Sequence, residues 1–290
     1  VSESITPWEN DLVSHDATTK EYVVINSTKG HLKEAIAAAN KDYTKIKNLK
    51  ITGEISAQDF YFMRDSMENL AALNLKEVII RGGEQRLTGG AQGVYPHNDY
   101  EIPYEALRGK KSLNLLVLPD KLTKIGIAAF ADDQNITGSL IIPEGVTEIE
   151  VGAFYDCRSM NGTLSLPSTL KYLGRGIDLW WYGGVFTYCG FTSELILPNN
   201  LECIAGNNTF AGCEGLHGEL RFPEKLTEIS DGAFNGCKSL TGSITIPQGV
   251  HKLPTSVFQF CDNLNGTLTL PDGITSIGYN CFQGCALKGE

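Results

Sequence analysis

The chain has 290 residues, of which 42% are hydrophobic and 20% charged, and its net charge is -10 at pH 7. This composition is typical of a folded soluble protein. The acidic balance argues against a nucleic-acid partner, because binding to the phosphate backbone needs a basic surface. No apolar run approaches the roughly 20 residues that span a bilayer, so no transmembrane segment is predicted.

Residues 1–72 contain no repeat, and their pattern predicts a helix, a strand and a second helix. Apolar residues on one helical face predict a helix within 28–43, and residues 48–55 read as a strand. Ser56 and Asp59 have the spacing of a capping box at the start of a helix over 56–70. We expect an N-terminal capping region that covers the end of an array. An independent functional domain is the alternative.

The chain becomes periodic at about residue 115. Seven prolines follow one another at intervals of 24, 24, 31, 25, 24 and 24 residues, namely Pro119, Pro143, Pro167, Pro198, Pro223, Pro247 and Pro271. Phenylalanine and cysteine recur at nearly fixed distances after most of them. A fixed period in this range is typical of a solenoid, in which each unit buries its apolar face only by stacking on its neighbours.

Each unit has the pattern of a short strand that ends at the proline. The residues one and three before the proline are apolar, as in Leu220 and Phe222, which predicts a strand with one buried face. We divide the chain into a cap (1–72) and a solenoid (73–290), with a degenerate unit over 73–114 and seven units over 115–290. In the degenerate unit Leu107 replaces the phenylalanine and Lys110 the cysteine, and Asp133 replaces the cysteine in the next unit.

The full pattern L-x-x-I-x-x-x-A-F-x-x-C-x-x-L-x-x-x-L-x-L-P, complete in residues 226–247, resembles the BspA-like family of bacterial leucine-rich repeat proteins. The resemblance implies a mostly β fold with some α, a leucine-rich-repeat solenoid wound as a curved right-handed coil behind an α/β N-terminal cap. It also implies a cell-surface or secreted protein, whose signal peptide we expect to have been removed. The function implied is adhesion or other binding of protein ligands, from host matrix or other cells.

Six of the eight cysteines share one repeat position, which predicts a ladder of buried thiols. Strand spacing of about 4.8 Å exceeds the roughly 3.5–4.5 Å between Cβ atoms that a disulfide prefers. A disulfide or a metal site is the alternative. Cys203 falls on an outward position and is expected to be the most reactive thiol.

No motif for catalysis, cofactor binding or metal binding is found in the sequence. The five histidines share no metal-ligand spacing, and P-loop, G-x-S-x-G and H-E-x-x-H motifs are absent. We predict no enzyme activity, no cofactor and no metal.

Two segments are candidate binding sites. Leu115, Val117 and Ile141 fall on outward strand positions, and three apolar side chains there predict either a partner-binding patch or a surface covered by the loop 81–101. The third unit carries eight extra residues between Pro167 and Phe186. Insertions in solenoids often lie on the binding face.

That insertion includes Trp180, Trp181 and Tyr182, which are predicted either to recognise a ligand or to pack over the core. If these aromatics stack on sugars, the alternative function is glycan binding in a nutrient-uptake system. A structural spacer is a further alternative. The sequence stops after the turn at Phe282 and Cys285 and predicts an exposed last coil, hence a monomer or a weak edge-to-edge dimer.

Overall fold

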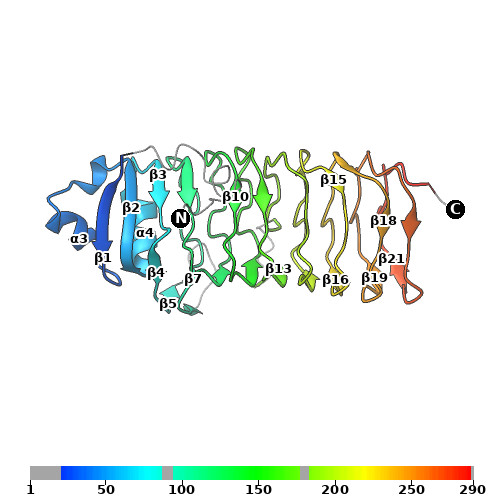
Figure 1. The fold of residues 1–290 in the computed structure, drawn as a ribbon, viewed down its shortest axis with the longest axis horizontal. Helices are drawn as coiled ribbons and strands as arrows, with labels where there is room; N and C mark the ends of the chain where they lie inside the picture. Colours follow the sequence, from blue (N-terminus) through cyan, green and yellow to red (C-terminus); the bar gives the residue numbers. More distant parts are fainter. Residues whose placement is uncertain (1–20, 87–93, 177–182, 289–290) are drawn as a thin grey trace, which may run out of the picture.

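The computed structural model of the protein describes residues 21–86, 94–176 and 183–288. The chain forms a row of stacked coils, with helices at the N-terminal end and the C-terminus at the far end (Figure 1). Most strands are two to five residues long and pair in parallel with the next coil. The structure thus confirms the mostly β solenoid.

The N-terminal region alternates strands and helices. In order these are β1 (Val23–Ser27), α3 (Leu32–Ala38), the 3-10 helix η1 (Tyr43–Lys45), β2 (Asn48–Ile55), α4 (Ala57–Ser66), β3 (Ala72–Asn74) and β4 (Val78–Ile80). The predicted strand over 48–55 is β2. Strands β1, β2, β3 and β8 are successive parallel neighbours, so one sheet continues across residue 72. The division of the chain at residues 72 and 73 stays a prediction.

Asp59 joins the two helices of this region. Its Oδ2 accepts hydrogen bonds from the backbone nitrogens of Ser56 and Gly30, both at 2.8 Å. Its Oδ1 accepts one from the nitrogen of Leu32 at 2.9 Å, at the start of α3. The predicted capping box at α4 is therefore present, and the same carboxylate also holds the N-terminus of α3.

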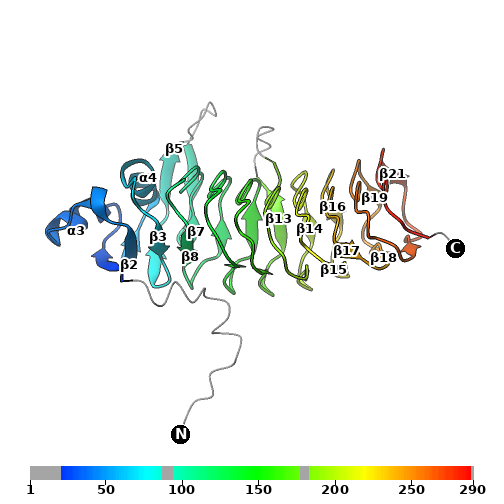
Figure 2. The same cartoon turned by 90° about the horizontal axis from the view of Figure 1, so that it is seen from above.

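The coils carry two rows of strands, which Figure 2 shows on opposite sides of the array. The first row contains β8 (Leu115–Val117), β10 (Leu140–Ile141), β12 (Leu164–Ser165), β15 (Gly218–Glu219), β17 (Leu240–Thr241), β18 (Ile244–Thr245) and β20 (Leu268–Thr269). The second row contains β7 (Glu101–Ile102), β9 (Lys124–Ile125), β11 (Glu148–Glu150), β13 (Tyr172–Arg175), β14 (Cys203–Ile204), β16 (Glu228–Ile229), β19 (Lys252–Leu253) and β21 (Ser276–Ile277).

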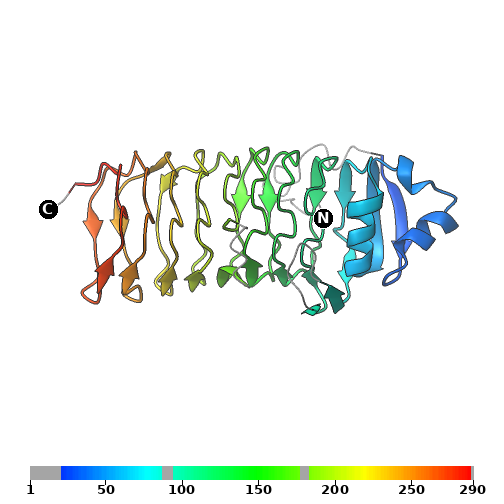
Figure 3. The same ribbon diagram turned by 180° about the vertical axis from the view of Figure 1, so that it is seen from behind.

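Only the first row was predicted. Its apolar residues alternate with period two, whereas those of the second row, such as Val146 and Ile149, are three apart and do not indicate a strand. In the N-terminal region, α4 lies on the second-row side (Figure 2) and in front of β2 (Figure 3). Strands β5 (Gly83–Arg86) and β6 (Val94–His97) form an antiparallel hairpin that projects from the same side.

A ladder of phenylalanine rings forms the centre of the coils. Neighbouring rings stack with centroids 5.2–5.7 Å apart, in the order Phe130, Phe154, Phe186, Phe210, Phe234, Phe258 and Phe282. Phe154 and Phe186 stack at 5.7 Å although the insertion separates them in sequence. The extra residues of the third unit therefore leave the ladder unbroken.

The cysteine ladder runs beside these rings. All eight cysteines are free, and all except Cys285 are buried. Each ladder thiol donates a hydrogen bond of 2.9–3.2 Å to the carbonyl of the phenylalanine of the preceding coil, the donors being Cys157, Cys189, Cys213, Cys237, Cys261 and Cys285. Burial raises the pKa of Cys213 to about 12. The predicted thiol ladder is therefore correct.

Candidate functional site

Leu115 does not form the outward patch that the sequence predicts. Its side chain is only 7% exposed and packs with Ala72 of the neighbouring strand β3, with Tyr22 and Val117 against the pair. The expected cover, the loop 81–101, instead contains the β5–β6 hairpin, which projects from the side opposite β8 (Figure 2). Tyr22, which is far away in sequence, packs against Ala72 and Leu115 in its place.

The other predicted residues are not gathered into one site. Ile141 in β10 is half-buried. Trp180, Trp181 and Tyr182 lie outside the described residues, so their role stays a prediction.

The exposed part of the first row lies further along the array. Ile196, two residues before Pro198, is 68% exposed. Its outward neighbours in this and the next two coils are also exposed, namely Glu194, Glu219, Arg221 and Thr245. Accessible apolar and charged side chains thus occur together in the C-terminal half of this face.

A groove of about 660 Å³ opens on this face between two coils. One side is Glu219 to Phe222 with Glu224, and the other is Ser243 with Thr245 to Gln248. Such a volume lies within the roughly 300–1,000 Å³ of small-ligand pockets. Leu220, Phe222 and Ile246 supply an apolar floor, and hydroxyl and carboxylate groups supply a polar rim.

The backbone ladder is interrupted at this groove, as it also is between β8 and β10. In the next coil interface, the nitrogens of Ile244 and Ile246 donate to the carbonyls of Thr267 and Thr269, each at 2.9 Å. Among the described residues no such ladder bond joins 220–222 to 243–246, and β15 pairs with β17 instead. Backbone polar groups of these residues therefore make no ladder bond across this interface.

Phe222 is the unusual residue at this interface. The equivalent position is leucine or isoleucine in the other units, such as Leu197 and Ile246. The ring of Phe222 makes edge contacts with Phe234 at 5.7 Å and with Phe258 of the next coil at 6.2 Å. A ring that contacts both coils takes more room than leucine. This substitution is the sequence signal that could have located the groove.

The rim of the groove is acidic. The guanidinium of Arg221 bonds Glu219 through Nη2 at 2.7 Å, an interaction that raises the pKa of Arg221. Glu224 is exposed on the same rim. Because Glu219 neutralises the single arginine of the lining, the remaining charge is negative.

Cys203 is not the reactive thiol that the sequence predicts. It occupies the outward position, in register with Tyr172 and Glu228, yet it is only 1% exposed. Its thiol lies 3.0 Å from Oε2 of Glu228, and burial with this carboxylate raises its pKa to about 12. The longer side chains of neighbouring coils cover it.

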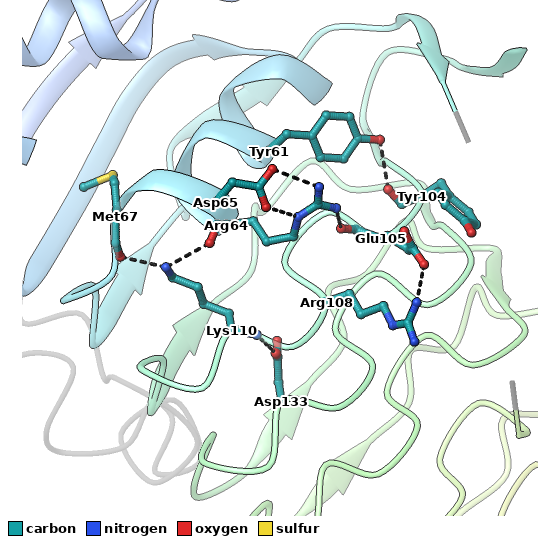
Figure 4. Close-up of polar contacts among 9 residues, drawn as sticks. All are labelled: Tyr61, Arg64, Asp65, Met67, Tyr104, Glu105, Arg108, Lys110 and Asp133. Carbon is teal, nitrogen blue, oxygen red and sulfur yellow. Dashed lines mark hydrogen bonds and ion pairs between the residues drawn. The ribbon is translucent and has the colours of Figure 1, made fainter. Parts of the chain in front are cut away.

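Figure 4 shows the polar contacts that fasten α4 to the first coil. The hydroxyl of Tyr61 donates to the carbonyl of Tyr104 at 3.0 Å, and Nη1 of Arg64 donates to that of Glu105 at 2.8 Å. Nζ of Lys110 donates to the carbonyls of Arg64 and Met67, at 3.1 and 2.7 Å. Lys110, at the cysteine position, thus binds the C-terminal end of α4, where a cation is favourable. This cluster has a structural role.

Asp133, at the next cysteine position, is buried with one unbonded oxygen. Its Oδ1 accepts a hydrogen bond from the nitrogen of Lys110 at 2.5 Å, while Oδ2 has no hydrogen-bond partner among the described residues. Burial raises the pKa of Asp133 well above its ordinary value. The carboxyl stands where other coils have a thiol that donates to a carbonyl.

Replacing Asp133 with asparagine is expected to stabilise the protein at pH 8 by about 1 kcal/mol, and by less at pH 4. Because the folded pKa is raised, the wild type has the full contribution of this group only below about pH 4 and loses it as the pH rises. Urea unfolding of the wild type and the variant from pH 4 to pH 8 measures the difference between their free energies of unfolding. If the free energy of unfolding depends on pH equally in the two proteins, Asp133 is not the source of the loss of stability at higher pH.

Residues 21–86, 94–176 and 183–288 were compared with the side-chain groupings of metal sites and the helix lengths of membrane spans. No three His, Cys, Asp or Glu side chains there are grouped to hold a metal ion. No helix in the same residues has the length and apolar character to cross a bilayer.

Several solved structures of leucine-rich repeat proteins are similar to this chain. A leucine-rich repeat protein of T. pallidum is 27% identical, with a TM-score of 0.43, over 65% of this chain and 71% of that one. A leucine-rich cell surface protein of Faecalibacterium prausnitzii is 20% identical, with a TM-score of 0.45, over 92% of this chain and 63% of that one. A leucine-rich repeat protein of Bacteroides ovatus is 19% identical, with a TM-score of 0.30, over 93% and 87% of the two chains.

A comparison with curated proteins found no significant match. The model of the BspA type leucine rich repeat region matches residues 100–177 and 182–289 in six copies. The matched residues are more than half of the chain and coincide with its stacked coils. The chain therefore belongs to the BspA-type leucine-rich repeat family.

Proposed function

We propose that this chain is a non-enzymatic binding protein that takes an extended segment of a protein ligand into the first-row groove. The observation that carries the proposal is the break in the backbone ladder at Leu220 and Phe222, beside a groove of about 660 Å³. An extended peptide can bond to unpaired strand groups while its side chains enter the adjacent groove.

The charges on the rim select the kind of segment. Glu224 and the Glu219–Arg221 pair leave the groove negative, and the whole chain has a net charge of -10. Opposite charge on the partner speeds encounter and favours the correct pairing. The preferred segment is therefore extended and carries lysine or arginine.

The location that suits this role is the cell surface or the outside of the cell, as the family resemblance implies. The F. prausnitzii protein is described as a cell surface protein. Adhesion to host matrix or to other cells is the form of binding that we propose for this location.

An array of 12-residue peptides with matched basic, neutral and acidic sequences tests the proposal. Basic extended peptides are expected to bind, and Glu224→Lys is expected to weaken their binding about tenfold or more. Asp272→Lys is the matched control, since Asp272 also follows a repeat proline and is exposed outside the groove lining. Equal binding by the two variants, or no preference for basic peptides, would overturn the proposal.

A further inference from the structure

A second surface with unusual side chains lies at the turn two residues after the ladder position of each coil, which is Leu107 in the first coil and phenylalanine in the others. The residue there has a positive φ, between 58° and 84°, in every coil, the residues being Gly109, Asp132, Asp156, Tyr188, Gly212, Gly236, Phe260 and Gly284. Glycine and aspartate tolerate this conformation, whereas a bulky aromatic residue is an outlier. Such outliers concentrate at functional positions. Tyr188 is 49% exposed, so packing alone does not explain it.

Tyr188 forms a pair with Tyr155 of the preceding coil. The two ring centroids are 6.4 Å apart and the rings are tilted by 60°. Each ring lies against a glycine of the next coil: a Cβ atom at Gly212 would lie 2.5 Å from Tyr188, and one at Gly183 would lie 2.5 Å from Tyr155. The two glycines therefore leave space that the rings require.

Polar groups surround this pair. The guanidinium of Arg158 lies 5.5 Å from the centre of the Tyr188 ring, and its Nε bonds Oδ1 of Asp156 at 2.5 Å. The other oxygen of Asp156 accepts a hydrogen bond from the amide of Gln134. The exposed guanidinium and amide groups of Arg158 and Gln134 thus border the two rings, and the buried Asp156 holds both in place.

We propose that Tyr155 and Tyr188, with Arg158 and Gln134 positioned by Asp156, form a binding site for a neutral saccharide. A pyranose has an apolar C–H face that packs on an aromatic ring, and hydroxyl groups that pair with planar donors and acceptors at its edge. A peptide anchor would instead use a pocket with an apolar centre. The site goes beyond the proposed function, because its residues and its ligand differ from those of the groove.

Isothermal titration with neutral tetrasaccharides built of glucose, xylose or mannose tests the site on the full chain. At least one is expected to bind, and Tyr188→Gly is expected to weaken that binding about tenfold or more. Glycine fits the positive φ, so the variant should melt no lower than the wild type. Phe260→Gly is the matched control, since Phe260 has the same conformation and a similar exposure.

The outcomes separate the two proposals. Loss of saccharide binding in Tyr188→Gly, with basic-peptide binding retained, supports the saccharide site. Absence of binding to every tetrasaccharide overturns it, as does equal binding by Tyr188→Gly and Phe260→Gly. Tyr155→Leu gives a second measure, because it removes one ring without touching the residue of positive φ.

Discussion

Phe210→Ala is expected to lower the free energy of unfolding by about 3–5 kcal/mol. Phe210 is fully buried and stacks on Phe186 at 5.5 Å and on Phe234 at 5.4 Å. Removing the ring leaves a cavity between two coils whose backbones are held by their own hydrogen bonds and cannot collapse into it. Urea unfolding followed by circular dichroism measures the loss.

Phe210→Leu is the control, because Leu107 shows that leucine fits the same position in another coil. Its cost should be much smaller, about 1–1.5 kcal/mol. Since each coil contacts only its neighbours, hydrogen exchange should accelerate most in the coils next to residue 210. Equal costs for alanine and leucine, or a uniform acceleration along the array, would contradict the ladder as the source of stability.

Asp59→Ala is expected to cost about 3 kcal/mol or more, since each buried donor left without a partner costs about 1–3 kcal/mol. The carboxylate accepts hydrogen bonds from three backbone nitrogens, those of Ser56, Gly30 and Leu32, and Asp59 is only 2% exposed. Its loss should free the ends of α3 and α4 together. Thermal unfolding, with hydrogen exchange at residues 28–34, measures both effects.

Asp42→Ala is the matched control. Asp42 also caps a helix, accepting a hydrogen bond from the nitrogen of Thr44 at 3.0 Å, but it does so at the surface. Water can replace it there, so the expected cost is only about 0.5–1 kcal/mol. A similar loss in the two variants would mean that burial of Asp59 has no special importance.

The repeat made most of the fold predictable. A ladder needs the same residue type at the same place in each coil, so Phe210 and Cys213 were assigned to the core although the unit before them is longer. Local rules were sufficient for β2 and for the capping box of Ser56 and Asp59. The bonds from Asp59 to Gly30 and Leu32 were not predictable, because they join segments 27 and 29 residues apart.

The candidate sites were harder to predict, because exposure depends on neighbours far away in sequence. Leu115 is covered by β3 and Tyr22, and Cys203 by side chains of adjacent coils, although both occupy outward positions. The groove is lined by the ring of Phe222, whose position in the repeat pattern indicates apolar character but not size. Tyr155 and Tyr188 are paired by stacking of coils, which a single-chain pattern does not reveal.

The thiol bonds have a consequence for protein engineering. In regular coils donor and acceptor are 27 residues apart, as for Cys213 and Phe186, but the bond from Cys189 to Phe154 spans 35 residues. Their lengths, 2.9 and 3.1 Å, remain similar. The frame thus tolerates extra residues between Pro167 and Phe186 while the register of later coils is kept. Foreign epitopes could be grafted there for display, with the intact Cys189 contact as the criterion of a successful graft.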